Sequence, residues 1–302
     1  MRIGRYSEHG KTSLFWQFTT AAGDAWIDGQ ALLPLVSASL RARFETALAG
    51  GDAELCRVLP ELETALAGIE KKPEISTRLA PGLPQKLQPP AHPRSLICVG
   101  LNYLDHARES GTEPPKQPLL FAKTGNALAA HGQPVRLPPD STQVDYEAEL
   151  AVIIGKECRQ IHAAQAGEAV AGFCCANDVS ARDFQFGDNQ WYRGKSADGF
   201  GPLGPVMVTP AEVGDPHRLR IRLRLNGRTL QDSNTSNLIF SVPELITYIS
   251  RSITLLPGDV ILTGTPPGVG FARKPPIYLQ PGDEMEVEIE KLGILYNPVV
   301  AG

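Results

Sequence analysis

Two glutamates at the entrance of an apolar run, Glu147 and Glu149, have types and a spacing that could bind a metal. They precede residues 150–154, an unbroken apolar stretch with the composition of a buried strand, which Gly155 ends. Because side chains alternate along a strand, both carboxylates should point to one face, about 7 Å apart along the chain. Two unpaired carboxylates leading into a buried strand would repel each other and lose hydration, so the pattern predicts a positive group between them.

A third acid, Asp178, follows the strand-like residues 171–176. Three carboxylates without a matching Cys or His cluster suit Mg²⁺ or Mn²⁺, with Ca²⁺ as an alternative, and leave coordination sites to water or substrate. The ordinary alternative is that the glutamates form a solvated strand face and the aspartate belongs to a turn. The residue types alone leave these two interpretations equally supported.

His106 and Glu109 are three residues apart in a stretch expected to form a short helix, residues 103–110, with Asn102 as its N-cap and Gly111 closing it. Both side chains should share one helix face. A carboxylate beside an imidazole fixes its tautomer or favours its charged form, as a base that activates water requires. A surface ion pair is the alternative.

Lys195 lies between glycine and serine, where little side-chain bulk hinders the approach of a ligand. Its ammonium could neutralise the three carboxylates or hold a substrate oxyanion. The surrounding residues are not a phosphate-binding loop, because Asn189 stands where that motif has a glycine. Lys123, which ends another strand-like segment, is the less favoured cation.

Five stretches of the chain together resemble the fumarylacetoacetate hydrolase family. They are CVGLNYLDHARE (98–109), DYEAELAVIIGK (145–156), ANDVSARD (176–183), RGKSADGFGPLGP (193–205) and ILTGTPPGVG (261–270). The resemblance covers about residues 93–300, with the motifs in the family's order and at similar spacing. Five motifs in register make this a specific signal.

The resemblance implies a role for each chemical candidate. It implies that Glu147, Glu149 and Asp178 hold a divalent metal. It also implies that His106 and Glu109 lie on a short helix or lid that closes over this metal.

On the substrate side, the resemblance places Lys195 beside the metal as the residue that stabilises negative charge. It implies that the hydroxyl and backbone of Thr265 meet the substrate carboxylate, and we include the preceding Gly264 as a substrate-binding candidate. Arg182 and Asp183 closely follow the third acid, and we expect them to form an orienting salt bridge. Arg182 is also counted among the substrate-binding candidates.

Composition narrows the class of protein. The 302 residues are 42% hydrophobic and 21% charged, as in ordinary globular proteins with a sizeable core. A net charge of −4 argues against a nucleic-acid or anionic-membrane partner. The five cysteines show no CxxC spacing, so we expect reduced core residues, as in a cytoplasmic protein. The first residues, MRIGRYSEHGK, are charged and lack the apolar core of a signal peptide, and the sequence has no 18-residue apolar stretch that could span a membrane.

The pattern of elements predicts an α+β protein in two domains. Strand-like pieces in residues 1–30 and helical stripes in residues 37–70 form a small N-terminal α/β domain, and the prolines of residues 73–93 an extended connection. We place the boundary between residues 1–92 and 93–302. Strands dominate the second part, and the resemblance implies the family's mixed β-roll or β-sandwich catalytic domain, usually a homodimer.

These expectations lead to a functional hypothesis. The predicted protein is a metal-dependent hydrolase that cleaves a carbon–carbon bond of an acylpyruvate, a small 2-oxo acid of aromatic catabolism, through a metal-stabilised pyruvate enolate. The same site would serve an oxaloacetate decarboxylase or a 2-hydroxydienedioate isomerase. A non-catalytic metal-binding scaffold is the alternative of another class. No GxGxxG sequence follows a strand and opens a helix, as a dinucleotide-binding site requires, and no GxSxG motif of a serine nucleophile is present.

Overall fold

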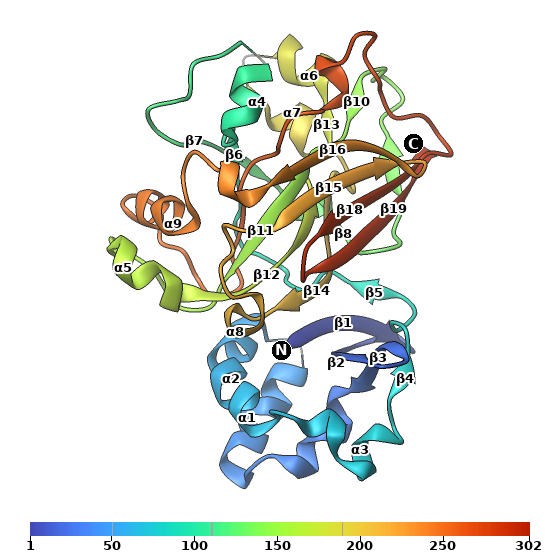
Figure 1. Ribbon diagram of the computed structural model, residues 1–302, viewed down its shortest axis with the longest axis vertical. Coiled ribbons are helices and arrows are strands. Elements are labelled where there is room, and N and C mark those ends of the chain that lie inside the picture. Colours follow the sequence, from blue (N-terminus) through green and yellow to red (C-terminus); the bar gives the residue numbers. More distant parts are fainter. Residues whose placement is uncertain (50, 110, 189) are drawn as a thin grey trace.

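The computed structural model describes residues 1–49, 51–109, 111–188 and 190–302. Its N-terminal part consists of β1 (Arg2–Glu8), β2 (Lys11–Thr20), β3 (Gly23–Asp28), the 3₁₀ helix η1 (Gly29–Leu35), α1 (Ala38–Leu48), α2 (Asp52–Ala65), η2 (Ile69–Lys71), α3 (Pro73–Ser76), β4 (Ala80–Pro81) and β5 (Leu87–Gln88). These blue and cyan elements form the lower end of the molecule in Figure 1.

The longer C-terminal part carries most of the strands. Its first half contains β6 (Leu96–Gly100), α4 (Leu104–Glu109), β7 (Leu119–Lys123), η3 (Gly125–Ala127), β8 (Leu128–Ala129), β9 (Val135–Leu137), β10 (Val144–Asp145), β11 (Ala148–Ile154), α5 (Ala163–Ala166), η4 (Gly167–Ala169), β12 (Val170–Asn177), β13 (Ser180–Ala181), α6 (Arg182–Gly187) and α7 (Tyr192–Lys195). Its second half contains β14 (Gly201–Val208), α8 (Pro210–Val213), β15 (Arg220–Leu225), β16 (Arg228–Asn234), η5 (Thr235–Asn237), α9 (Val242–Ser250), β17 (Val260–Leu262), η6 (Gly270–Ala272), β18 (Glu284–Ile289) and β19 (Gly293–Ala301).

The largest sheet of the described chain runs through both parts, in the order β4-β3-β2-β1-β14-β12-β11-β17-β6-β7. The join is the antiparallel pairing of β1 with β14, in which Ile3 lies opposite Met207. The two predicted domains therefore share one sheet. Parallel pairs such as β17 with β6 occur beside antiparallel ones, which confirms the mixed α+β fold class.

A second sheet, β16-β15-β18-β19-β9, lies across the C-terminal part in Figure 1. β15 buries alternate residues, as its sequence pattern predicts, and turns its arginines outward. Arg224 pairs with Glu286 at 2.7 Å and with Glu288 at 2.6 Å on the neighbouring β18. The arginine stripe is thus a paired, outward-facing strand surface, and its charges need no external anion.

Two local expectations are wrong. The proline-rich stretch is not wholly extended, because it contains α3, where Pro73 occupies the first turn and its missing N–H leaves no bond unmade. Asn102 is not a helix cap: its Nδ2 donates to Thr263 O at 2.7 Å and to Phe240 O at 3.1 Å. Its amide instead joins the segment before α4 to the ends of two distant loops.

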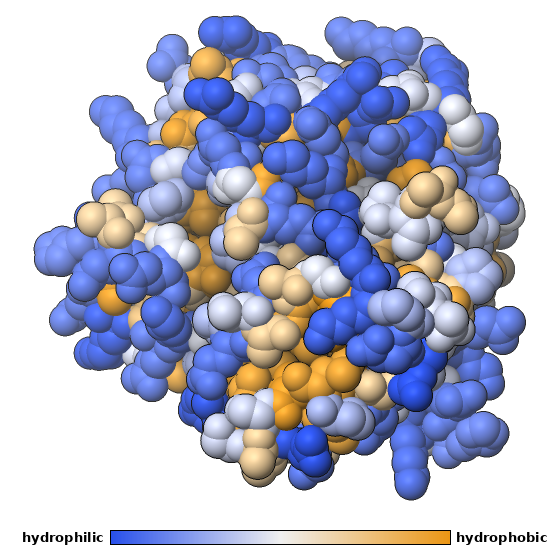
Figure 2. Space-filling model, turned by 60° about the horizontal axis from the view of Figure 1, so that its bottom comes forward, coloured by the Kyte–Doolittle hydropathy of each residue, from blue (hydrophilic) through white to orange (hydrophobic). Residues whose placement is uncertain are grey.

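The surface and the cysteines agree with the composition. Figure 2, which turns the lower end of the molecule forward, shows a largely hydrophilic face with apolar side chains gathered toward its lower edge. All five cysteines are buried and unpaired, which confirms that they are reduced core residues. None of the described helices is long and apolar enough to cross a membrane.

Candidate active site

The pairing of β11 with β12 brings the three predicted metal ligands together. Ala148 lies opposite Asn177, so Glu147 and Asp178 face each other just beyond the paired residues, and Asp178 N donates to Glu147 O at 2.9 Å. Ligand oxygens of Glu147, Glu149 and Asp178 all lie within 4.8 Å of one another. Since these residues are 7%, 1% and 1% exposed, the alternative of a solvated strand face is excluded.

Two lysines neutralise part of this acidic cluster. Lys195 Nζ bridges Glu147 Oε2 at 2.8 Å and Asp178 Oδ2 at 2.7 Å. Lys123 Nζ contacts the other oxygen, Asp178 Oδ1, at 2.7 Å, and donates to the carbonyls of Val179 and Phe200 at 2.9 Å. Both candidate lysines therefore reach the site, but only Lys195 bridges two of the acids.

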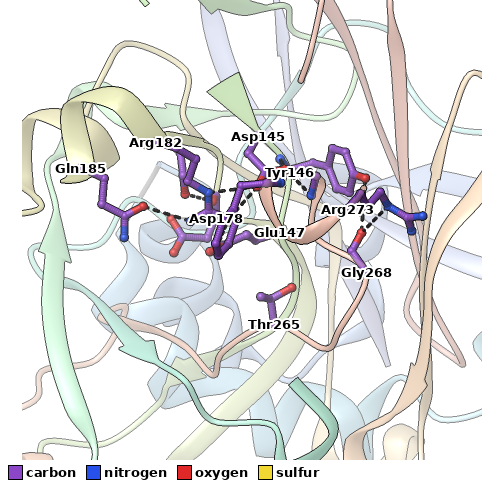
Figure 3. A network of polar contacts seen from close by, with 12 residues as sticks. Asp145, Tyr146, Glu147, Asp178, Arg182, Gln185, Thr265, Gly268 and Arg273 are labelled. Carbon is purple, nitrogen blue, oxygen red and sulfur yellow. Dashed lines mark hydrogen bonds and ion pairs between the residues drawn. The ribbon is translucent and has the colours of Figure 1, made fainter. Parts of the chain in front are cut away.

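Arg182 forms the expected orienting salt bridge, with partners other than its neighbour in sequence. Its guanidinium donates to Asp145 Oδ2 at 2.8 and 2.9 Å and to Glu147 Oε1 at 2.6 Å. A third edge donates to Gln185 Oε1 at 3.0 Å, and the Phe271 ring stacks 4.4 Å away. Figure 3 shows Arg182 reaching across this cluster from α6.

Asp183 turns away from Arg182. Its carboxylate accepts hydrogen bonds from the Ser141 hydroxyl at 2.7 Å and from Thr142 N at 2.9 Å. It therefore fixes the turn that precedes β10 rather than a charge in the site.

The acidic cluster carries a net negative charge when all of its ionisable groups are charged. Four acids (Asp145, Glu147, Glu149, Asp178) face three bases (Lys123, Arg182, Lys195), so 4 − 3 leaves one excess negative charge when all are ionised. Burial raises the pKa of Glu149 well above its usual value, and the nearby Asp178 and Glu147 raise it further. A divalent cation between these carboxylates would relieve this repulsion, so the donor set fits a hard metal ion.

The charged forms of Glu147 and Lys195 are favoured by their partners, whereas burial disfavours that of Lys123. Burial alone would raise the pKa of Glu147, but Arg182 and Lys195 outweigh it and hold that pKa well below its usual range. Burial would likewise lower the pKa of Lys195, but Asp178 and Glu147 raise it above the ordinary value. In Lys123 burial prevails, and its pKa is lowered despite the pairing with Asp178.

The predicted His–Glu pair is present on α4, and its carboxylate is held by a distant loop. His106 Nδ1 lies 3.0 Å from Glu109 Oε2. The backbone N–H of Gly268 donates to both oxygens of Glu109, at 3.0 and 3.2 Å. At the other end of the helix, Asp105 Oδ2 accepts from Ser233 Oγ at 2.6 Å. The helix that carries the pair is thus anchored at both ends.

The loop after β17, residues 264–271, donates backbone hydrogen bonds to three carboxylates of the site, Glu149, Glu109 and Asp145. Gly264 N donates to Glu149 Oε2 at 2.7 Å, so this candidate substrate contact is engaged by a candidate metal ligand. The positive φ of +97° and a Cβ that would lie 2.8 Å from the Asn102 side chain restrict this position to glycine. The neighbouring Thr265 is 6% exposed and lies below the acidic cluster in Figure 3.

Asp145 is a site residue that the sequence did not reveal. It is fully buried, and besides Arg182 it binds the backbone N–H groups of Gly270 at 2.7 Å and Phe271 at 3.1 Å. Asp145 therefore connects residues 270–271 to the segment that carries Glu147 and Glu149. Its place two residues before Glu147, at the start of the same motif, is the one signal that could have found it.

The comparisons with known proteins agree with this site. Residues 95–300 match the family model described as fumarylacetoacetate (FAA) hydrolase C-terminal. With its mixed sheets and acidic cluster, the chain belongs to the fumarylacetoacetate hydrolase family and is an enzyme of that family.

Proteins similar to this chain are named as a tautomerase, a hydrolase and an isomerase. It is 51% identical over 216 residues to oxaloacetate tautomerase FAHD2A, mitochondrial, of Bos taurus, covering 71% of this chain and 69% of that protein. The structure is similar to a fumarylacetoacetate hydrolase from Exiguobacterium antarcticum, with a TM-score of 0.78, 35% identity and complete coverage of both chains. It is also similar to a 2-hydroxyhepta-2,4-diene-1,7-dioate isomerase from Mycobacterium marinum, with a TM-score of 0.72, 31% identity and coverage of 100% and 98%.

Proposed function

We propose that this protein is a divalent-metal-dependent enzyme that forms and stabilises the enolate of a small 2-oxo acid. The observation that carries the proposal is the loop of residues 264–271. Gly264, at the start of the loop, holds Glu149 of the acidic cluster, and Gly268, in its middle, holds Glu109 of the His–Glu pair. A proton-transfer pair and a cation site are thereby fixed to the same short segment.

The cation, Mg²⁺ or Mn²⁺, would be held by Glu147, Glu149 and Asp178. When bound, it supplies the Lewis acidity that stabilises negative charge on the 2-oxo oxygen of a substrate. The chain's own residues do the rest. Lys195 places a positive charge beside two of the acids, and Thr265 directly follows Gly264, whose N–H holds the third.

His106 is the proposed proton acceptor. Donation from Nδ1 to Glu109 selects the tautomer in which Nε2 carries the lone pair, and the carboxylate stabilises the imidazolium that forms. Gly268 keeps that carboxylate in place.

The reaction we favour is the keto–enol tautomerisation of oxaloacetate. A base removes a proton from C3, the electron pair moves to the 2-oxo oxygen, and that oxygen gains a proton, so the step balances without a co-reactant. The names of relatives about half identical to this chain support this choice. The site supports it through a candidate base and a candidate enolate-stabilising centre that contact the same loop.

Hydrolysis of an acylpyruvate is the second candidate, and the His–Glu pair is the observation that favours it. The same base could remove a proton from water, which attacks the distal carbonyl and releases a carboxylic acid and pyruvate. Decarboxylation of oxaloacetate and isomerisation of a 2-hydroxydienedioate would need the same enolate. A homodimer that acts in the cytoplasm remains part of the proposal.

A panel of substrates tests these alternatives. The Mg²⁺-loaded protein is mixed with oxaloacetate while the ultraviolet absorbance of the enol, CO₂ and pyruvate are followed, and then with a series of acylpyruvates. We expect faster equilibration of keto and enol forms, without CO₂ or pyruvate, and its loss on addition of EDTA. Pyruvate with a carboxylic acid would establish the hydrolase, and pyruvate with CO₂ the decarboxylase. No reaction with any substrate would leave the scaffold hypothesis.

A further inference from the structure

Gln231 on β16 is a fully buried amide that joins two parts of the site. Its Oε1 accepts from Ala148 N at 2.9 Å, and its Nε2 donates to Thr265 Oγ1 and to Pro266 O, both at 2.8 Å. An amide has one acceptor oxygen and two donor hydrogens, and all of these functions are used. The geometry therefore fixes which atom of Gln231 donates and which accepts.

This polarity decides what the Thr265 hydroxyl can do. A hydroxyl carries a single hydrogen, and Thr265 Oγ1 already accepts one hydrogen bond from Gln231. Within residues 1–49, 51–109, 111–188 and 190–302, no further hydrogen-bond partner of Thr265 Oγ1 occurs. Its hydrogen is thus left for an acceptor that comes from outside the chain.

The position of the hydroxyl identifies that acceptor. Thr265 follows Gly264, whose N–H holds Glu149 of the acidic cluster. We propose that Gln231 is a positioning residue that commits the Thr265 hydroxyl to donate to a carboxylate oxygen of a 2-oxo acid bound at the cluster. This inference rests on the proposed function, since it names the ligand of the same site.

The Oε1 atom of Gln231 fixes the position of the Thr265 hydroxyl relative to the strand that carries Glu149. Ala148, whose N–H it accepts, lies between Glu147 and Glu149 at the start of β11. One rigid amide therefore spans the strand of the acids and the loop of the hydroxyl. A substrate that contacts both groups therefore meets a fixed spacing between them.

A double-mutant cycle read by binding tests the inference. Oxalate is the probe, because it presents two adjacent carboxylates and undergoes no enolisation. Its affinity for the Mn²⁺-loaded protein is measured by calorimetry for wild type, Gln231→Met, Thr265→Val and the double variant. Mn²⁺ affinity and thermal unfolding are measured in parallel. Thr265→Ser, which retains the hydroxyl, tests rescue by a conservative change, and Gln17→Met, at a buried glutamine on β2 of the other sheet, serves as the control.

We expect each single variant to weaken oxalate binding about tenfold, because Thr265→Val removes the donor of the charge-assisted hydrogen bond and Gln231→Met removes the group that orients this donor. The double variant should bind no worse than either single one, Thr265→Ser should bind more tightly than Thr265→Val, and Gln17→Met should bind like wild type. If the two losses multiply to about a hundredfold, Gln231 acts independently of Thr265 and the inference is wrong. It is also wrong if Gln231→Met binds oxalate as wild type does.

Gln231→Glu covers the case in which Gln231→Met does not fold. A carboxylate there still accepts from Ala148, but it accepts from Thr265 as well and so removes the hydrogen from the substrate. Affinity should fall as in Thr265→Val, and unchanged affinity overturns the inference. The two failures can be told apart. If the protein binds oxalate but converts no 2-oxo acid, the proposed function is wrong, and the double-mutant cycle still tests the role of Gln231. A wild-type protein that does not bind oxalate overturns both.

Discussion

Glu109 on α4 accepts the backbone N–H of Gly268 at 3.0 Å, although 159 residues separate them in the chain. The contact joins the helix that carries the proposed base to the loop that holds Glu149. A base that must act on a ligand of the acidic cluster is thereby kept at a fixed place relative to it, as efficient proton transfer requires.

Gly268→Ala should break the hydrogen bond between the backbone of residue 268 and Glu109. Gly268 has a φ of +100°, and a Cβ there would lie 2.2 Å from Leu230 O, so the loop has to move. We expect kcat to fall at least about tenfold. Mn²⁺ affinity should change little, because Glu149 lies on β11 and the other two acids directly adjoin β11 and β12. Gly187→Ala, on α6 with open space around its Cβ position, is the control. Unchanged kcat in Gly268→Ala would mean that the contact does not serve the base.

Glu109→Gln tests the pair itself. The amide keeps the shape of the side chain but cannot stabilise an imidazolium, so kcat should fall by about 10²–10⁴ with a modest change in KM. His106→Ala should fall at least as far. Steady-state kinetics on whichever 2-oxo acid is turned over provides the measurement. If both variants retain wild-type kcat, the assignment of the base is wrong.

The sequence predicted the acidic residues of this site better than the hydrogen bonds that connect its parts. Glu147, Glu149 and Asp178 were found because strand alternation and an apolar run can be read locally. Gln231 and Asp145 were missed because their roles depend on partners far along the chain. Asp145 is important only because residues 270–271 return to it, and no local pattern shows that return.

The same distinction applies to the fold. The alternation of residues 219–225 predicts β15 and its outward arginines, since burial of one face is a local property. Two domains were expected from a local change in composition. The sheet shared through β1 and β14 could not be foreseen, because strand pairing at a separation of about 200 residues leaves no mark in either segment.

The ionisation of Glu149 predicts how pH acts on the metal-free protein. Its pKa is raised in the folded state, so between the unfolded value of about 4.3 and the raised value the folded protein binds more protons. Stability in EDTA should therefore fall as pH rises through this window. Mn²⁺ should oppose the fall, because it favours the ionised carboxylate. Thermal unfolding against pH measures both effects, and Glu149→Gln, which cannot ionise, should lose this part of the dependence. A wild-type profile that matches Glu149→Gln would contradict the assigned shift.

The two lysines should separate charge stabilisation from folding. Lys195 bridges two of the acids and packs 4.9 Å from the Phe121 ring, whereas Lys123 has a fully buried side chain that also binds backbone carbonyls. Removing a charge that acts on a developing enolate affects the chemical step, so Lys195→Met should lower kcat by about 10²–10³ and leave metal affinity within about tenfold. Removing Lys123 leaves buried acceptors unpaired, so Lys123→Met should chiefly lower stability, by about 3–5 kcal/mol, with a milder effect on kcat. Urea unfolding and kinetics on the same preparations measure the two effects. The reverse order would show that Lys123 is the cation that serves the substrate, and equal small effects on kcat would mean that neither lysine does.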